Sequence, residues 1–254
     1  MDVCVLASGS SGNCFYVDSG KGGILIDAGI SCKQICLRLN AIGKDISEVH
    51  SVFITHEHID HVKGLRVLAN RYDIDIYLTK GTFSLLPFLL PEEKVHFFEG
   101  KTVVRGSLVR GFAKSHDAAD PISYLVSHEK KTVGFITDIG YACPAVQDAL
   151  HKSDALVLEA NHDLGMLERG KYPFHLKKRI SGPEGHLSNY DASLLVLEHA
   201  TPRLNHVFLS HLSKENNTPD LAMWTFESLT RERKDLSLSV SVTCPEEPSE
   251  ILHI

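Results

Sequence analysis

Three histidines and an aspartate lie within six consecutive positions, directly after a segment with the composition of a buried strand. The segment is Ser51–Ile54, and the run that follows reads Thr-His-Glu-His-Ile-Asp-His and ends at His61. Residues two positions apart share one face of an extended chain, so His56, His58 and Asp60 can converge on one side. Imidazoles and carboxylates are ligands that zinc, manganese and iron accept in proteins. We therefore expect a metal-binding loop rather than a solvated polar turn, which would use Gly, Asn, Asp or Ser.

The composition is that of a globular protein with a real core. The chain has 254 residues, of which 43% are hydrophobic and 23% charged, enough for one large domain or two small ones. The N-terminal residues Met1–Leu6 do not resemble a signal peptide, and no apolar run approaches the roughly twenty residues of a membrane span. The six cysteines form no C-x-x-C pair. These features predict a reduced, cytoplasmic protein without a membrane association.

The charge argues against a broad surface for nucleic acid but leaves a local one open. The net charge is −6 and the sequence pI is about 6.2. The stretch 170–185 nevertheless carries Lys177, Lys178 and Arg179, with aromatic residues between its basic residues. Basic and aromatic side chains together suit a phosphate backbone with stacked bases. A solvated helix face is the alternative interpretation of this stretch.

The order of the expected elements predicts an α/β fold of four layers. Short strands dominate the first half, and strands alternate with helices in the second, which favours two sheets with helices outside them, an αββα sandwich. We expect a single domain over residues 1–254, with two pseudo-symmetric halves of roughly 1–135 and 136–254. The expected helices are 31–41, one after His61, 83–86, 144–150, 191–199 and 219–231. The expected strands are 3–6, 14–17, 24–26, 51–54, 74–78, 103–113, 122–127, 132–136, 155–158, 206–209 and 236–242. The C-terminal segment 245–250 is expected to be a polar extension.

Four further metal-capable side chains follow expected strands. They are Asp27, His116, Asp138 and His211. Loops gather at strand ends to form functional sites, so these residues can join the histidine loop. Each of them alone would more often be a helix cap or a surface residue, but their common placement favours one site.

With these residues the chain resembles the metallo-β-lactamase superfamily and, within it, the YycJ/WalJ-type proteins. The superfamily resemblance spans nearly the full length. The closer resemblance is carried by the segments 6–13, 25–29, 115–117, 185–189 and 210–213. It implies the αββα fold and a centre of two divalent metal ions, with zinc, manganese and iron all compatible with the ligands.

The resemblance also implies a role for each candidate ligand. One metal would be held by His56, His58 and His116, and the other by Asp60, His61 and His211. Asp138 would bridge the two ions, which would share a hydroxide nucleophile. Asp27 would hydrogen-bond the histidine loop without touching metal.

The resemblance favours phosphodiester chemistry. Glu159 and His186 resemble a pair that, in the tRNase Z branch, assists protonation of the leaving group, and a carboxylate is suited to keep an imidazole protonated. Glu159 as a helix cap and a structural His186 are the alternative. Together with Asp60 these two residues are the predicted catalytic side chains, and Lys177, Lys178 and Arg179 are predicted to grip the phosphate backbone. The Ser8–Asn13 loop can add backbone donors for a phosphate or be only a tight hairpin.

The YycJ/WalJ resemblance implies an exonuclease that acts on DNA from the 5′ end, with DNA favoured over RNA on this ground alone. A small-molecule phosphodiesterase or thioesterase of the same fold is the alternative enzyme. A non-enzymatic scaffold would require a broken ligand set, whereas every ligand position here is filled. Exposed strand edges leave homo-oligomerisation open.

Overall fold

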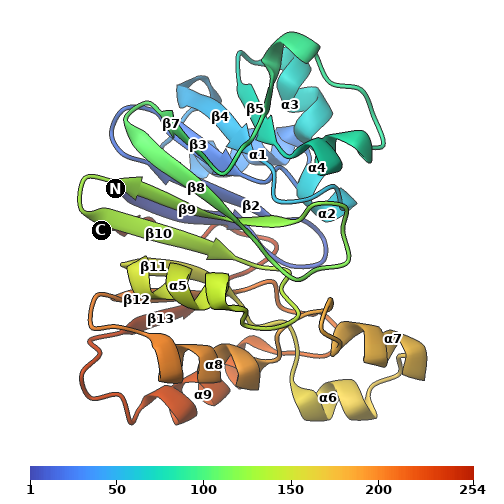
Figure 1. The fold of residues 1–254 in the computed structure, drawn as a ribbon, viewed down its shortest axis with the longest axis vertical. Coiled ribbons are helices and arrows are strands. Elements are labelled where there is room, and N and C mark those ends of the chain that lie inside the picture. The colour runs from blue at the N-terminus through green and yellow to red at the C-terminus, as the bar shows by residue number, and fades with distance from the viewer.

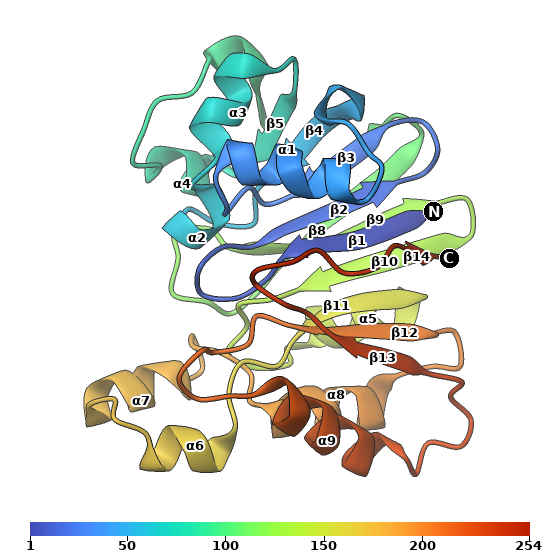
Figure 2. The same cartoon turned by 180° about the vertical axis from the view of Figure 1, so that it is seen from behind.

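The computed structural model describes residues 1–254 and contains two seven-stranded sheets that lie face to face (Figures 1 and 2). In the first sheet the order is β14 (Leu252–His253), β1 (Asp2–Ala7), β2 (Cys14–Asp18), β3 (Gly23–Ile26), β4 (Val49–Phe53), β5 (Asp75–Leu78) and β6 (Val95–Phe97). In the second it is β13 (Ser239–Val242), β12 (His206–Ser210), β11 (Ala155–Glu159), β10 (Lys131–Ile136), β9 (Ile122–His128), β8 (Ser107–Ala113) and β7 (Lys101–Val104).

Helices cover the outer faces of both sheets. The first sheet is covered by α1 (Cys32–Ala41), α3 (Leu65–Arg71) and α4 (Lys80–Ser84), and the second by α5 (Pro144–Lys152), α8 (Asn189–His199) and α9 (Pro219–Thr230). The short α2 (Ile59–Val62), α6 (Leu164–Arg169) and α7 (Phe174–Ile180) lie at one end of the sandwich. Short 3₁₀ turns precede β4 and β6, at Ile46–Glu48 and Glu92–Lys94. None of the helices has the length and apolar character to cross a membrane.

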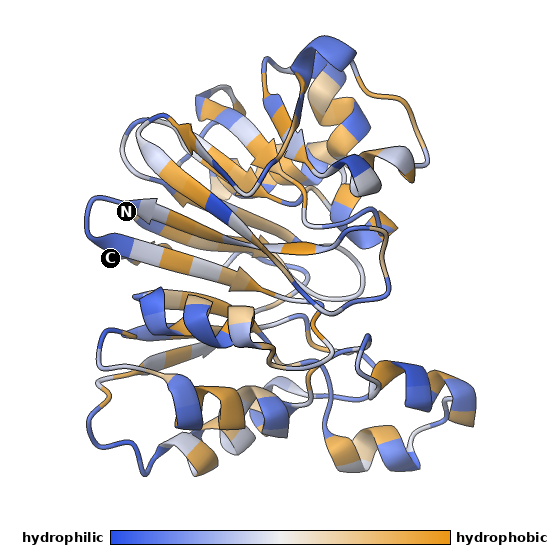
Figure 3. Cartoon of the chain, viewed as in Figure 1, coloured by the Kyte–Doolittle hydropathy of each residue, from blue (hydrophilic) through white to orange (hydrophobic).

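Three apolar layers hold the four structural layers together. On β1, Val3 and Val5 pack between the sheets, whereas Cys4 and Leu6 pack against the helices outside. Successive side chains of a strand point to opposite faces, so a strand covered on both sides must be apolar throughout. Figure 3 shows hydrophobic colour along much of the central strands, interrupted by paler residues. The predicted αββα sandwich is confirmed.

Several element boundaries differ from the prediction. The expected strand 103–113 is a hairpin of β7 and β8, because Arg105 and Gly106 adopt positive φ angles of 49° and 81° and form the turn. The helix expected at 83–86 is α4, which begins earlier because the Thr79 side chain caps it by accepting from Thr82 N. The last strand of the second sheet begins at Ser239 rather than at residue 236. The strands β6 and β14 and the helix α6 were not predicted.

The C-terminal segment is not a free polar extension. Ser249 N donates to Val5 O, and Val5 N donates to Ser249 Oγ at 3.0 Å. Beyond it, β14 pairs with β1 in antiparallel fashion. The chain therefore crosses from the second sheet back to the first at its end. The earlier change of sheet falls between β6 and β7, near residue 100 and not near 135, where the sequence analysis divided the chain into halves.

Parallel strands set the place of the site. Within the first sheet β3, β4, β5 and β6 run parallel, and within the second sheet β10, β11, β12 and β13 do so. The carboxyl ends of parallel strands meet at one edge of a sheet. The loops that carry most of the polar residues predicted from the sequence leave from these ends.

Candidate metal centre

The backbone turns sharply at three of the predicted site residues. Asp27, Asp138 and His211 follow β3, β10 and β12 and have φ angles of 61°, 55° and 57°. The other two non-glycine residues with positive φ, Arg105 and Glu129, lie in hairpin turns. Left-handed backbone costs free energy in residues other than glycine and is found where surrounding contacts enforce it, often at functional sites. The strained turns direct these three polar side chains back over the strand ends.

One group of donors consists of three imidazoles. His56 Nε2 lies 3.1 Å from His58 Nδ1, and His116 Nε2 lies 3.3 Å from the same atom. Two nitrogens bound tetrahedrally at roughly 2.0–2.1 Å from one ion are about 3.3 Å apart. The spacing of the three nitrogen atoms therefore fits one metal ion.

The second group combines a carboxylate with two imidazoles. Asp60 Oδ2 lies 3.6 Å from His61 Nε2 and 3.7 Å from His211 Nε2. His61 is fully buried and His211 nearly so, whereas the Asp60 side chain is partly open to the cavity. These atoms lie within 4.8 Å of one another.

Asp138 lies between the two groups. Its Oδ2 is 3.3 Å from His61 Nε2, and its Oδ1 is 4.0 Å from His116 Nε2. Oδ2 is buried without a hydrogen-bond partner, and so is His211 Nε2. Buried polar atoms without partners are rare and need an explanation. A cation at the second group would satisfy both atoms, since Asp138 Oδ2 lies beside His61 of that group and His211 belongs to it, so the donor set fits divalent metal ions.

Four imidazoles are oriented in the same way, with Nδ1 fixed by an oxygen and Nε2 turned to the donors described above. The Nδ1 partners are Thr55 Oγ1 for His56 at 2.9 Å, Asp27 Oδ2 for His61 at 2.7 Å, Gly185 O for His116 at 3.4 Å and Glu159 Oε1 for His211 at 2.7 Å. Metal-binding histidines are commonly held by such a bond on the other ring nitrogen. Asp27 also accepts from Thr55 N at 2.8 Å, so it contacts the histidine loop at two residues.

The charges of the site divide the histidines into two kinds. Burial lowers the pKa of His56 far below its usual value and that of His116 to about 4. Burial also acts on His61 and His211, but the carboxylates around them, foremost Asp138, outweigh it and raise the pKa of both. Burial would raise the pKa of Asp138, yet the charges of His211 and His61 hold it well below its usual value.

Glu159 reaches the cavity only through two histidines. Its carboxylate is fully buried, and its Oε1 lies 2.8 Å from His186 Nδ1 and 2.7 Å from His211 Nδ1. Its Oε2 accepts from the N–H groups of Ile139 and Leu187. Burial would raise the pKa of Glu159, but the charge of His186 and the hydrogen bonds with His186 and His211 lower it to about 2. Glu159 and His186 therefore lie in direct contact.

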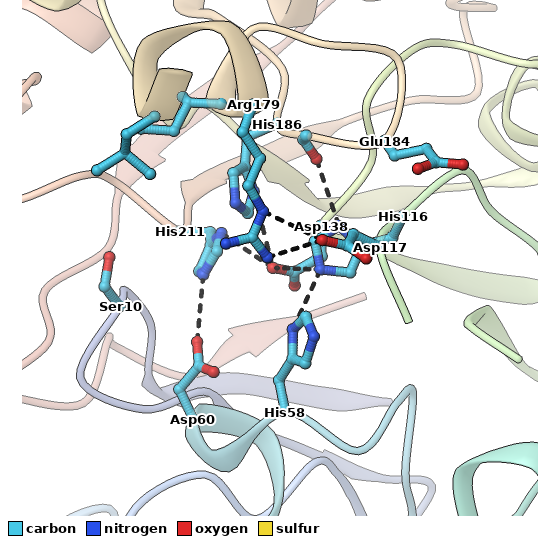
Figure 4. Close-up of a pocket in the computed structure, with 13 residues that line it drawn as sticks. Ser10, His58, Asp60, His116, Asp117, Asp138, Arg179, Glu184, His186 and His211 are labelled. Carbon is cyan, nitrogen blue, oxygen red and sulfur yellow. Dashed lines mark hydrogen bonds and ion pairs between the residues drawn. The ribbon is translucent and has the colours of Figure 1, made fainter. Parts of the chain in front are cut away.

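Of the three basic residues predicted to grip the substrate, only Arg179 lies at the cavity. Leu176, Arg179 and Ile180 line it from one face of α7 (Figure 4). At 100° per residue Lys178 lies on the opposite face of this helix. Lys177 Nζ donates at 2.7 Å to the carbonyl of Glu168 in α6 and so joins the two helices.

Sequence reasoning missed residues whose role depends on distant contacts. Lys114 is buried beneath the site and donates to Thr137 O at 2.8 Å, which holds the turn before Asp138. Burial lowers the pKa of Lys114, against the opposite effect of the Asp138 charge. A charged side chain in an otherwise apolar strand end, two positions before His116, was the available signal.

The turn between β1 and β2 is built into the site. Asn13 N donates to Asp60 O at 2.8 Å, and the buried Asn13 side chain bonds Gly9 N through Oδ1 at 3.0 Å. Ser8 Oγ accepts from His211 N at 2.7 Å, across 203 positions of the chain. The turn thus holds two residues of the second donor group, Asp60 and His211, through one hydrogen bond each. Sequence spacing could not reveal these contacts.

A four-layer αββα sandwich with this arrangement of histidines and aspartates defines a class of metal-binding proteins. The chain belongs to the metallo-beta-lactamase superfamily, whose sequence model matches residues 7–211. The match includes the histidine loop and extends to His211. The resemblance inferred from the sequence is thereby confirmed at the level of the superfamily.

Within the superfamily the chain is a YycJ/WalJ-type protein. It is 34% identical to Exodeoxyribonuclease YycJ of Bacillus anthracis over 258 residues, which cover 98% of both chains. It is 38% identical to Exodeoxyribonuclease WalJ of Streptococcus pneumoniae over 228 residues, or 87% of this chain and 85% of that protein. The metallo-beta-lactamase fold protein YhfI from Bacillus subtilis superposes with a TM-score of 0.73 at 13% identity over 98% of both chains, which supports the fold.

Proposed function

We propose that the protein is a divalent-metal-dependent nuclease that hydrolyses DNA from the 5′ end. One observation supports the dependence on metal. Four histidines are fixed through Nδ1 so that each Nε2 faces the other donors of the site, which include the carboxylates of Asp60 and Asp138. The DNA substrate is proposed from the full-length similarity to two exodeoxyribonucleases. These relatives do not favour a small-molecule phosphodiesterase or thioesterase.

The proposed ligands form two sets that share Asp138. His56, His58 and His116 would hold one ion, and Asp60, His61 and His211 the other. Bound divalent cations lower the pKa of water and offset charge on a phosphoryl oxygen. Zinc and manganese both suit these donors, and iron does as well.

His186 is the proposed proton donor. Its Nδ1 lies within hydrogen-bond distance of Glu159 Oε1, so its Nε2 is free to donate a proton to the oxygen of the leaving group. The side chain is partly exposed and lines the cavity, as a group that meets substrate must be. Glu159 fixes the orientation of the His186 ring through this contact.

Arg179 is the proposed contact to the phosphate backbone. A guanidinium binds phosphate through paired hydrogen bonds, and Arg179 is the only lysine or arginine that lines the cavity. The net charge of −6 supports a local rather than an extensive electrostatic contact with DNA.

A cytoplasmic location is proposed because all six cysteines are free. Homo-oligomerisation through exposed sheet edges stays a prediction, which light scattering of the purified protein would check.

The decisive experiment compares metal-loaded wild type with Asp138→Asn on 5′-labelled single- and double-stranded DNA and RNA, with bis(4-nitrophenyl) phosphate and a thioester alongside. Asp75→Asn is the matched control, because Asp75 pairs with His96 far from the cavity. We expect wild type and the control to release mononucleotides or short products progressively from the 5′ end of DNA. Turnover of small esters alone, or equal DNA cleavage by Asp138→Asn, would overturn the proposal.

A further inference from the structure

The cavity at the metal centre extends beyond the donors. It has a volume of about 300 Å³, at the lower end of the range for small-molecule sites. Ser10 and Arg179 both line it; in the view of Figure 4 Ser10 lies at the left and Arg179 reaches in from above, over the donor residues. Asp117, Glu184 and His186 make up the rest of the polar wall. An anionic substrate therefore meets only one fixed positive charge of the chain.

That positive charge is already paired. Arg179 donates to Asp117 Oδ2 from Nε at 3.1 Å, and its Nη2 lies 2.8 Å from the same oxygen as an ion pair. The Arg179 side chain is 63% exposed and that of Asp117 is 56% exposed. An ion pair so exposed contributes little free energy, because water solvates both partners well. A phosphate can therefore displace Asp117 from the guanidinium at small cost.

Asp117 is held in place while Arg179 is free to turn. Asp117 N donates to Glu184 O at 3.2 Å, and the neighbouring Ala119 N donates to Glu57 Oε1 at 2.9 Å. Arg179 makes no side-chain hydrogen bond other than those to Asp117. The pair can thus open by rotation of the arginine alone.

The turn that brings Ser10 to the cavity wall has free backbone donors. No hydrogen bond within the chain engages the N–H groups of Ser10 and Ser11 at the tip of the β1–β2 turn. Both residues are exposed, whereas Asn13 below them is fully buried and holds the turn through Gly9. Free backbone N–H groups on a rigid turn are suited to bind an anion.

We propose that Arg179 and the Ser10–Ser11 turn bind phosphates of the substrate strand next to the one that is cleaved, one phosphate at each place, and that Asp117 occupies Arg179 until its phosphate arrives. This rests on the proposed function, since only a substrate with neighbouring phosphates can use both places. A compound with a single phosphodiester cannot release Arg179 in this way. Asp117 and Arg179 therefore select for a nucleic acid strand.

The test is a double-mutant cycle on metal-loaded protein with Arg179→Gln, Asp117→Asn and the double variant. The substrates are an oligothymidylate with a 5′-phosphate, the same strand with a 5′-hydroxyl, and bis(4-nitrophenyl) phosphate. The readout is the ratio of kcat/KM for each strand to that for the small ester. A contrast between the two strands tells whether the bound phosphate is the terminal one or the next one along.

We expect Arg179→Gln to lower the ratio at least about tenfold, the loss of a charged hydrogen bond, mainly through KM. We expect Asp117→Asn to raise the ratio several-fold when Arg179 is present and to leave the ratio unchanged in the Arg179→Gln background. An equal rise in both backgrounds would mean that Asp117 only repels phosphate, and would overturn the proposal. An equal loss on strand and small ester in Arg179→Gln would do the same.

Two further comparisons secure the result. Ser10→Asp should lower the ratio of kcat/KM for a strand to that for the small ester more than Ser10→Asn does. Lys178→Gln removes a charge from the far face of α7 and should leave this ratio unchanged. All these side chains are exposed, so thermal unfolding should be unchanged. If wild type cleaves the small ester but no strand, the proposed function fails. Binding of a phosphorothioate oligothymidylate to the same variants then still decides whether the second phosphate site exists.

Discussion

A residue that would not touch substrate or metal can still set the tautomer of a metal-binding histidine. Asp27 is fully buried, and its two carboxylate oxygens accept from Thr55 and lie against His61 Nδ1. Because a carboxylate can only accept, the proton of a neutral His61 must sit on Nδ1. Its Nε2 lone pair then faces the donor cluster. Asp27 therefore controls the binding capacity of His61.

Asp27→Asn reverses the direction of the hydrogen bond to His61 with little change in the shape of the side chain. The amide nitrogen would donate to His61 Nδ1, and the proton of His61 would move to Nε2. We expect the affinity for zinc or manganese to fall about 10–100-fold while the thermal unfolding of the metal-free protein changes little. Calorimetric titration of metal into metal-free protein measures the affinity.

The control for Asp27→Asn is Asp75→Asn, which breaks an exposed carboxylate–histidine pair outside the site. An affinity for metal in Asp27→Asn equal to that of this control would show that Asp27 does not act through His61. A loss of folding in Asp27→Asn would instead assign its role to the structure of the strand end.

His206 predicts a pH effect on stability away from the metal centre. Its Nδ1 lies 2.6 Å from Ser239 Oγ and its Nε2 lies 3.0 Å from Ser241 Oγ, which joins β12 to the edge strand β13. Burial lowers the pKa of His206. The unfolded chain therefore binds more protons at this position, and the stability contributed by the neutral ring is lost as the pH falls below about 6.5.

We expect the free energy of unfolding of wild type to fall more than that of His206→Gln between about pH 7.5 and about pH 5.5. Urea denaturation at both values measures the difference, and other histidines cancel because both proteins contain them. An equal pH dependence of the two proteins would contradict the burial of a neutral ring.

At the scale of elements, backbone contacts place the histidine loop. Ala28 N donates to His61 O at 2.9 Å, Gly64 N to Ala28 O at 2.8 Å, and Gly29 N to Asn13 O at 2.8 Å. A Cβ atom on residue 29 would overlap the Asp60 carbonyl. The segment after β3, the β1–β2 turn and α2 thus pack backbone against backbone. Glycine at position 29 makes this approach possible.

Gly29→Ala should push Asp60 away from the second donor group. We expect a loss of about 1–3 kcal/mol in the free energy of unfolding, the usual cost of forcing atoms into packed space, with weaker binding of metal. Gly165→Ala in α6 is the control, because its Cβ meets only the end of the flexible Arg169 side chain. Urea denaturation and metal titration of both variants check this. Unchanged values for Gly29→Ala would show that the loop adapts.

Sequence alone could predict the parts of the site that are contiguous or that end a strand. The histidine loop falls in six positions after β4, and Asp27 and His211 directly follow strands, so local pattern was sufficient. The sequence marks Lys114 as unusual, but its partner Thr137 and the bond from Ser8 to His211 could not be predicted, because these contacts join segments that only the folded chain brings together. That Lys178 lies away from the cavity follows from the orientation of α7, and the basic composition of the segment does not determine this orientation.

At the scale of the whole molecule, the donors come from both sheets. His56, His58, Asp60 and His61 follow β4 of the first sheet, whereas His116, Asp138 and His211 follow β8, β10 and β12 of the second. Each proposed ion takes ligands from both sheets. Metal bound to these residues would therefore hold the two sheets together at this end, in addition to the apolar layer between them.

Removal of metal should accordingly destabilise the entire domain. A ligand at a thousandfold excess over its Kd stabilises the folded state by about 4 kcal/mol, which corresponds to a rise of about 10 °C in Tm for a chain of this size. We expect a chelator to lower the Tm of metal-loaded wild type by this order and added zinc or manganese to restore it. Asp138→Asn should respond far less, because its bridging carboxylate is lost. Should the chelator shift both proteins equally, the ions would bind elsewhere. Should only the second sheet lose protection from amide hydrogen exchange, metal would not connect the sheets, since a link between them stabilises both at once.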